Sequence, residues 1–264
     1  MRLAARSAEV VIAVSAAQRP ALLPAANAAN VKLIVDPKLA VEPDACAARD
    51  VCDGGLAPGA MIWRGAAGSF ACSMGFTTDD TFTGSRFAFT AGHCSNGLNV
   101  TWGTGAQSIG PLVSAMDLNE VDASLIQVTN AAYTGQPGGR LYNTDDVDSV
   151  VNSLSSIIEG EVVCKAANFQ DPNGGRHCGE IDLVSDPAVR GMVRVRAEDA
   201  CPGDSGGPWY RLIDGITPKL RIAYGLHSRS DFGCRGDFGG TESWFSPLPS
   251  IEAAFAPTHV VETR

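Results

Sequence analysis

The stretch that decides the fold is Cys201-Pro202-Gly203-Asp204-Ser205-Gly206-Gly207-Pro208, in which one serine stands among three glycines. A serine hydroxyl is a weak nucleophile until a neighbouring base takes its proton. Glycines beside the serine let the backbone approach a substrate and aim N–H groups at a developing oxyanion. A structural turn rarely needs such a run of residues, so Ser205 is a candidate nucleophile.

Two further motifs contain the residue types that activate a serine. His93 lies in the stretch Thr90–Cys94 (TAGHC), and Asp122 opens the apolar stretch Val121–Ile126 (VDASLI). Histidine is the usual base for serine, and a buried carboxylate holds its ring in one tautomer. Taken alone, the histidine is more often structural and the aspartate more often a turn residue. The occurrence of all three motifs in this order favours a catalytic set.

A competing interpretation of the serine motif is the nucleophile elbow of α/β-hydrolases, which Gly203-x-Ser205-x-Gly207 also satisfies. That fold needs a helix after the serine, followed by its acid and its histidine. Here residues 209–213 (WYRLI) predict a strand, and His93 precedes the serine. The elbow interpretation therefore fails.

Composition excludes several classes of protein. The chain has 264 residues, of which 45% are hydrophobic, enough for a packed core. Its formal net charge of −9 gives no electrostatic footprint for nucleic acid. No stretch approaches the roughly 18 uninterrupted apolar residues of a membrane-spanning helix. We therefore expect no nucleic-acid partner and no membrane insertion.

The chain beyond about residue 60 predicts a mostly antiparallel β architecture, a sandwich or a barrel, in one unit or in two halves. Short segments rich in Val, Ile, Phe, Thr and Trp alternate with turn residues. Only Ser250–Phe255 predicts a short helix. The expected strands are Phe70–Thr77, Arg86–Thr90, Leu98–Trp102, Ala123–Val128, Gly160–Ala166, Glu180–Val184, Gly191–Ala197, Leu220–Leu226 and Glu242–Phe245.

The cysteines indicate disulfides rather than a metal site. Their number is even, and no CxxC pair of the kind that binds zinc occurs. Disulfides persist outside the cytoplasm, so we expect a secreted protein with no metal. The eight cysteines are Cys46, Cys52, Cys72, Cys94, Cys164, Cys178, Cys201 and Cys234.

At the three motifs the sequence resembles the chymotrypsin-like (trypsin-like) serine peptidases, especially their bacterial streptogrisin and α-lytic branch. The resemblance covers roughly residues 65–255. It implies an all-β fold of two antiparallel six-stranded β-barrels, with the active site in the cleft between them. It also implies that His93 is the general base, Asp122 the orienting acid and Ser205 the nucleophile. The backbone N–H groups of Gly203 and Ser205 would form the oxyanion hole.

The resemblance extends to Gly225–Ser228 (GLHS), which is similar to the family's strand beside the cleft. In the family, the serine corresponding to Ser228 supports the buried acid, and the backbone of this strand pairs with the substrate. A glycine usually stands two residues later, where this chain has Ser230. We expect Ser230 to crowd the entrance of the pocket.

The resemblance also implies particular pairings. Cys72 with Cys94, Cys164 with Cys178 and Cys201 with Cys234 match family disulfides, which leaves Cys46 with Cys52. Animal members of the family bury a new amino terminus against the acid before the serine, here Asp204. Bacterial relatives use an internal basic residue, and Lys165 or Arg140 is the candidate.

The substrate preference follows from the family residue six positions before the nucleophile, which lies at the floor of the pocket. That residue is Asp199 here. A buried carboxylate is costly unless a cation meets it, so the resemblance predicts cleavage after Arg or Lys. Alternatives are that Asp199 is a turn acid facing solvent, or that Glu198 or Asp237 is the pocket charge.

The domain organisation expected is one peptidase domain, preceded by a partly disordered leader or pro-region remnant. That first segment spans residues 1–60 and the peptidase domain residues 61–256. The first barrel covers about residues 61–140, the second about 150–248, and a short helix 250–255. Residues 257–264 form a tail.

The expected function is that of a secreted, monomeric serine endopeptidase without cofactor, which cleaves protein or peptide substrates through an acyl-enzyme. The alternatives are a catalytically silent homologue that acts as a binding module and an esterase on the same scaffold.

Overall fold

The computed structural model describes the chain in segments, and it divides into two units, residues 1–44 and 45–264. In the first unit, β1 (Val11–Val14) pairs in parallel with β2 (Lys32–Val35). All other elements belong to the second unit. The described segments are 56–65, 71–80, 82–95, 100–105, 107–134, 141, 147–167, 177–196, 200–213, 220–231 and 242–255, with the backbone of 11–14, 32–35, 46–48, 51–52 and 259–261.

One sheet of the second unit carries the histidine and aspartate motifs. Its eight strands lie in the order β19-β7-β8-β11-β10-β9-β5-β6, so that it curls without closing within the described residues. Its strands are β5 (Met61–Arg64), β6 (Ala71–Ser73), β7 (Thr77–Asp80), β8 (Arg86–Thr90), β9 (Thr101–Thr104), β10 (Gln107–Leu118), β11 (Val121–Gln127) and β19 (His259–Val261). A separate pair, β3 (Cys46–Ala48) with β4 (Val51–Cys52), is antiparallel.

The other sheet carries the serine motif and closes on itself. Its order is β12-β17-β16-β13-β14-β15-β18, and the additional pairing of β17 with β18 makes a six-stranded barrel. Its strands are β12 (Ser149–Val150), β13 (Val162–Lys165), β14 (His177–Asp186), β15 (Met192–Arg196), β16 (Pro208–Ile213), β17 (Leu220–Ser230) and β18 (Glu242–Pro247). All of its pairings are antiparallel except that of β12 with β17.

Strand burial explains why both sheets form. Residues 121–126 of β11 are buried without a break, as expected for a strand covered on both faces. In β15 the alternation Met192-Val193-Arg194-Val195-Arg196 places the valines inside and leaves Arg196 exposed. This is the pattern of a half-buried antiparallel strand.

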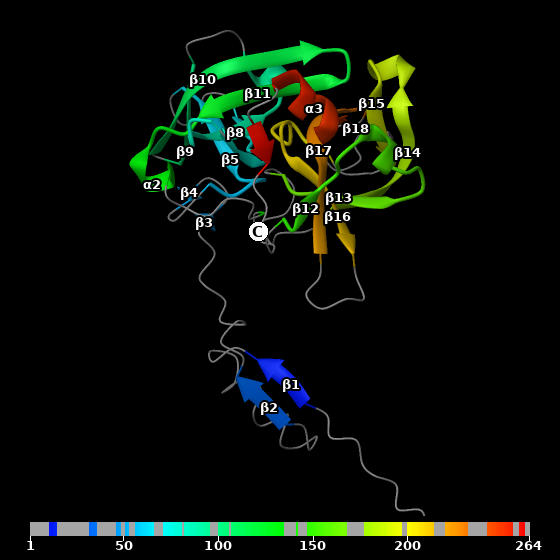
Figure 1. Cartoon of the computed structure of the whole chain (residues 1–264), viewed down its shortest axis with the longest axis horizontal. Helices are drawn as coiled ribbons and strands as arrows, with labels where there is room; N and C mark the ends of the chain where they lie inside the picture. Colours follow the sequence, from blue (N-terminus) through cyan, green and yellow to red (C-terminus); the bar gives the residue numbers. More distant parts are fainter. Residues whose placement is uncertain are drawn as a thin grey trace, which may run out of the picture. The chain divides into compact units, whose positions relative to one another are not determined.

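A shared core joins the two sheets. Phe89 and Val121 of the first sheet pack in the same hydrophobic cluster as Leu226 and Phe245 of the second. The closing helix α3 (Leu248–Phe255) contributes to this cluster, and the rings of Phe89 and Phe255 meet edge to face at 5.7 Å. Figure 1 shows α3 beside strands of both sheets. Because the packed interior resists deformation, side chains from the two sheets keep fixed positions relative to one another.

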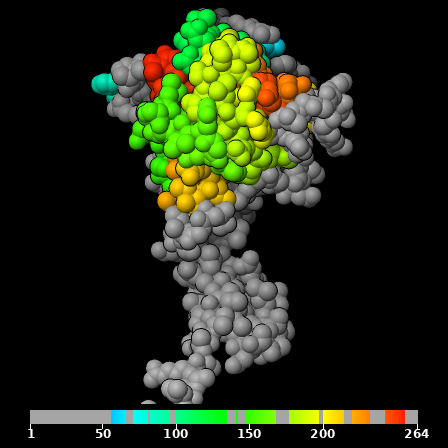
Figure 2. Space-filling view, turned by 90° about the vertical axis from the view of Figure 1, so that its right-hand side faces the viewer, coloured from blue at the N-terminus to red at the C-terminus, as the bar shows by residue number. Residues whose placement is uncertain are grey.

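The surface of the second barrel includes exposed large hydrophobic side chains. In Figure 2 the segment of about residues 147–196 (green to lime) covers much of one face. Leu154, Ile158 and Val162, which belong to this segment, are exposed large hydrophobic side chains. No helix in the described part of the chain is both long and apolar enough to cross a bilayer.

Candidate active site

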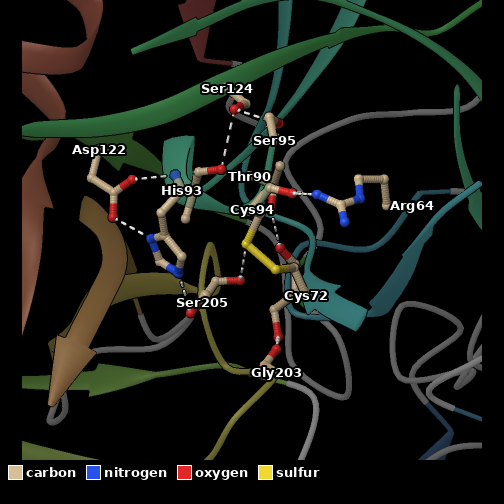
Figure 3. The surroundings of a disulfide bond; sticks show 12 residues. Arg64, Cys72, Thr90, His93, Cys94, Ser95, Asp122, Ser124, Gly203 and Ser205 are labelled. Carbon is tan, nitrogen blue, oxygen red and sulfur yellow. Dashed lines mark hydrogen bonds and ion pairs between the residues drawn. A yellow bond between two sulfur atoms is a disulfide. The ribbon is translucent and has the colours of Figure 1, made fainter. Parts of the chain in front are cut away.

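His93 is placed by a short 3-10 helix, η2 (Gly92–Cys94), which follows β8 directly. A side chain at Gly92 would not fit, because its Cβ would lie 2.0 Å from the carbonyl oxygen of Met116. A disulfide from Cys94 to Cys72 ties η2 to β6. The close contact at Gly92 and the disulfide, which Figure 3 shows, therefore both hold the segment that carries His93.

His93 joins Asp122 and Ser205 in one hydrogen-bonded chain (Figure 3). Its Nδ1 lies 2.7 Å from Asp122 Oδ2, and its Nε2 lies 2.8 Å from Ser205 Oγ. The Asp122 side chain is fully buried, whereas the His93 side chain is 33% exposed. The three residues predicted from the sequence therefore meet, with the histidine open to an incoming molecule.

The Asp122 carboxylate is held by three donors. The backbone N–H of His93 donates to Oδ1 at 2.8 Å, and Ser228 Oγ donates to Oδ2 beside the His93 ring. Burial raises the pKa of Asp122, but the hydrogen bonds and charge of His93 and the hydrogen bond of Ser228 outweigh it. The net result is a pKa below the ordinary value. The aspartate is therefore charged at neutral pH and holds the histidine ring in orientation.

The first sheet holds the serine loop, residues 203–207, by hydrogen bonds. Ser73 of β6 donates its N–H to the carbonyl of Ser205 at 2.8 Å and its hydroxyl to the carbonyl of Gly203 at 2.9 Å. Gly206 has a φ of +87°, and a Cβ there would lie 2.5 Å from the carbonyl oxygen of Ser73. Glycine is needed because both this conformation and this contact exclude a side chain.

The backbone around Ser205 leaves two N–H groups available. Gly203 has a φ of +100°, and neither its N–H nor that of Ser205 donates a hydrogen bond to another described residue. These are the two groups that the sequence predicts for an oxyanion hole. The oxyanion hole stays a prediction, with both of its N–H groups unengaged by the described residues.

An ion pair lies beneath the serine loop. Lys165 Nζ donates to Asp204 Oδ2 at 2.8 Å, and the same oxygen accepts the N–H of Cys201 at 3.0 Å. Of the two candidate cations for Asp204, the structure thus brings Lys165 to it. Arg140 lies outside the described residues.

Strand β17 forms the wall next to the serine. The N–H of Gly206 donates to the carbonyl of His227, and the N–H of His227 donates to the carbonyl of Gly207, each at 2.8 Å. The His227 ring is buried, and its Nδ1 accepts the Trp209 Nε1–H at 3.3 Å. Burial, then the charges of Lys165 and His93, hold the pKa of His227 well below its ordinary value. Its ring is therefore neutral at pH 7.

Some predicted residues lie outside the described part of the chain. Among them are Asp199 with its neighbour Glu198, and Cys234 with Asp237. Cys201 is disulfide-bonded, to a residue that is not among those described. For Cys46 and Cys52 only the backbone is described, in which the two positions face each other across β3 and β4.

The other predicted residues are described. Cys164 and Cys178 form a disulfide across β13 and β14, and no described cysteine is free. Ser230 is partly exposed at the end of β17. Within the described segments, no group of three or more His, Cys, Asp or Glu side chains could hold a metal ion.

Sequence reasoning missed two serines that hold the site together. Ser73 donates hydrogen bonds to the serine loop. Ser246 lies in the other sheet, and its Oγ accepts the backbone N–H of Asp122 at 2.8 Å. The position of Ser73, a small polar residue directly after Cys72, was the signal available in the sequence. Ser246 lies in an apolar strand, and its sequence carries no comparable signal.

Known proteins resemble this chain in sequence and in fold. No family model matches the chain. It is 32% identical over 178 residues to serine protease 1 of Streptomyces fradiae, covering 65% of this chain and 44% of that protein. It is 28% identical over 176 residues to glutamyl endopeptidase 2 of Streptomyces griseus, covering 65% of this chain and 85% of that protein.

Solved structures agree with these relatives. One of them is a glutamic-acid-specific serine protease that uses a histidine triad in substrate binding. Its structure superposes on this chain with a TM-score of 0.56 at 25% sequence identity, and the match covers 76% of this chain and 97% of that one. The chain has the fold of the bacterial chymotrypsin-like serine proteases. Two more examples are protease A of Thermobifida fusca (TM-score 0.56, 22% identity, 78% of this chain and 99% of that one) and α-lytic protease homologue N4 (0.55, 23%, 76% and 97%).

The comparisons confirm the chymotrypsin-like resemblance and the all-β fold class predicted from the sequence. Since the chain spans less than half of the Streptomyces fradiae protease, the activity of that whole protein is carried over only as a proposal.

Proposed function

We propose that this chymotrypsin-like chain is a serine endopeptidase that cleaves peptide bonds through an acyl-enzyme. The observation that carries the proposal is the continuous chain from Asp122 through His93 to Ser205, with contacts of 2.7 and 2.8 Å. In the proposed mechanism His93 Nε2 takes the Ser205 proton as Oγ attacks the scissile carbonyl. The charged Asp122 stabilises the imidazolium that forms, through the Nδ1 hydrogen bond.

The remaining steps follow from the same groups. The N–H groups of Gly203 and Ser205 stabilise the oxyanion. His93 then returns its proton to the leaving amine, which departs and leaves an ester at Ser205. A water molecule, deprotonated by His93, attacks that ester; the bond to Ser205 Oγ breaks as His93 returns the proton to this oxygen, and the acid product leaves. The protein supplies every proton transfer itself in this scheme.

A catalytically silent homologue is the alternative from another class. Such a protein has no need for a buried, charged Asp122 or for a partly exposed histidine in hydrogen-bond contact with a serine. The geometry favours the active enzyme. Esterase activity on the same scaffold is compatible with it, so that ester turnover alone does not separate the two.

The setting of the enzyme is also part of the proposal. The Cys72–Cys94 and Cys164–Cys178 disulfides favour an oxidising compartment, so we propose that the protein is secreted. We propose a monomer acting on proteins or peptides, with residues 61–256 as the peptidase domain. Residues 1–60 are proposed to be a leader or pro-region remnant, and residues 257–264 a tail.

Two preferences for the residue before the cleaved bond are candidates. The preference for Arg or Lys, predicted from Asp199, stays a prediction because residues 197–199 lie outside the described part of the chain. Cleavage after Glu is the second candidate. It is supported by two relatives, a glutamyl endopeptidase and a glutamic-acid-specific protease that binds substrate with histidines.

His227 is the observation in this chain that favours the acidic preference. It is buried in β17 directly beside the serine loop, and its Nδ1 is occupied as an acceptor. The neutral ring therefore carries its proton on Nε2. An N–H donor beside the serine loop suits a carboxylate better than a cation.

Cleavage-site mapping tests the proposal. A denatured protein mixture is digested with the wild type and with Ser205→Ala, and the new peptide ends are identified by mass spectrometry. The proposal expects new ends with the wild type only. Ends after Glu support the His227 preference, ends after Arg or Lys support the Asp199 preference, and no new ends contradict the endopeptidase proposal.

A further inference from the structure

Arg229 is a half-exposed cation next to Ser228, the residue that bonds the carboxylate of Asp122. It follows Ser228, whose hydroxyl donates to Asp122, and 42% of its side chain is exposed. No part of the proposed acyl-transfer chemistry uses its charge.

The guanidinium of Arg229 is only partly engaged. Its Nε donates to Ser228 Oγ at 3.3 Å, and its Nη2 lies 3.9 Å from Asp117 Oδ1, beyond hydrogen-bond distance. Neither Nη group donates a hydrogen bond to another described residue. The two Nη groups of Arg229 are therefore available to donate hydrogen bonds to a ligand.

Asp117 does not neutralise both of the cations beside it. Arg190 donates to its carbonyl oxygen at 3.1 Å and to its Oδ1 at 2.5 Å. One carboxylate of β10 thus faces two guanidinium groups. Asp117 stands opposite Asp122 across β10 and β11, so these groups lie near the triad.

Among the described strands, only β18 pairs with β17 at Arg229. β16 pairs with β17 only as far as Pro208 and Leu226, and the serine loop bonds to His227. Beyond that point Arg229 and Ser230 pair with Trp244 and Ser243 of β18 on the other side. No described strand pairs with Arg229 on the side of the serine, where an extended peptide could lie by strand addition.

We propose that Arg229 binds a carboxylate of the substrate, at a position other than the one directly before the cleaved bond. The inference rests on the proposed peptidase function. A guanidinium fork matches a carboxylate with two parallel hydrogen bonds. Arg229 extends toward Asp117 of the first sheet, whereas His227 is buried in the second barrel, so the two residues serve different substrate side chains.

The geometry of an extended peptide also limits which substrate residues can contact Arg229. Successive side chains of an extended peptide point to opposite faces. Only alternate substrate residues therefore reach the guanidinium, and an acidic preference is expected at one or two alternate positions rather than along the whole peptide.

The test uses matched peptide pairs that carry Glu or Gln at each position from four before to two after the cleaved bond. The ratio of kcat/KM for Glu over Gln is measured for the wild type, Arg229→Gln and Arg229→Glu. Arg196→Gln is the matched control, because Arg196 is an exposed strand arginine paired with Asp182 away from the triad.

The wild type is expected to favour Glu by about tenfold at one such position, as a charge-assisted pair allows. The ratio falls to within about twofold in Arg229→Gln, inverts in Arg229→Glu, and stays as in the wild type in Arg196→Gln. A ratio that survives in Arg229→Gln overturns the inference, even if both rates fall. Cleavage by the wild type with no Glu preference away from the cleaved bond overturns the inference alone, whereas a wild type that cleaves no peptide overturns the proposed function.

Discussion

Lys165 and Asp204 form an ion pair of 2.8 Å in which the lysine side chain is 1% exposed and the aspartate side chain is not exposed at all. The aspartate directly precedes Ser205 and also accepts the backbone N–H of Cys201. The pair therefore anchors the turn that presents the serine, and it does so with a cation from within the folded chain.

Removal of the lysine is expected to destabilise the protein strongly. In Lys165→Met the Asp204 carboxylate stays buried without its cation, and breaking such a pair costs about 3–5 kcal/mol. The free energy of unfolding in urea measures the loss, and peptide turnover is expected to fall with it because the serine turn loses its anchor.

Arg190→Gln is the matched control for this change. It breaks a partly exposed ion pair with Asp117, for which a loss of at most about 1 kcal/mol is expected. If Lys165→Met were no more destabilising than this control, the buried pair would not hold the serine turn.

Ser228→Ala tests the support of the aspartate. The variant removes a hydrogen bond to a charged group, worth about 1.5–3 kcal/mol, so kcat/KM is expected to fall about tenfold or more. Ser124→Ala is the control, because Ser124 is a buried serine of the same strand as Asp122 and bonds Ala91 and Ser95 instead. Equal losses in the two variants would contradict a specific role of Ser228.

The same variant makes a prediction about pH. The folded pKa of Asp122 lies below its ordinary value, so the aspartate stabilises the fold above that value and the stabilisation is lost as pH falls through the folded pKa. Without Ser228 the folded pKa rises. Urea unfolding as a function of pH is expected to show a smaller acid-dependent loss in Ser228→Ala than in the wild type, and an unchanged profile would contradict this.

His227 predicts a second pH dependence. Its folded pKa lies well below the ordinary value of about 6.5, so the unfolded chain binds a proton below that pH while the folded protein does not. Stability from this residue is therefore present above about pH 6.5 and declines as pH falls below it.

Unfolding free energies between about pH 7.5 and 5 measure this effect. The decline is expected to be shallower in His227→Gln than in the wild type and unchanged in His177→Gln, a variant of a histidine at the start of β14. A wild type with no decline over this range would contradict the burial of a neutral His227.

The sequence predicted elements best where local pattern and tertiary packing agree. Arg86–Thr90 is β8 without any shift, because an apolar run with turn residues on both sides is also a buried strand in the fold. The longest strand, β10, was not predicted, since Gly110 and Pro111 interrupt it. A register shift between Ser108 and Gly110 lets the strand continue through them, and that irregularity depends on its neighbours β9 and β11.

For the site, the sequence predicted the three residues that the structure joins by hydrogen bonds, but not the serines that position them. His93, Asp122 and Ser205 stand in short motifs that few other functions need. Ser246 and Ser73 act through neighbours that are distant in the chain, Asp122 and Gly203. Pairings of this kind follow only from the packing of the two sheets.

The most direct test of the account is the labelling of Ser205. The intact protein is treated with an organophosphonate probe, and peptide mapping by mass spectrometry locates the adduct, with Ser205→Ala as the control. The account predicts one adduct, on Ser205 of the wild type, together with loss of peptide turnover in proportion to labelling and a folded but inert control. Labelling that persists in Ser205→Ala, or peptide cleavage by that variant at the wild-type rate, would contradict the assignment of Ser205 as the nucleophile.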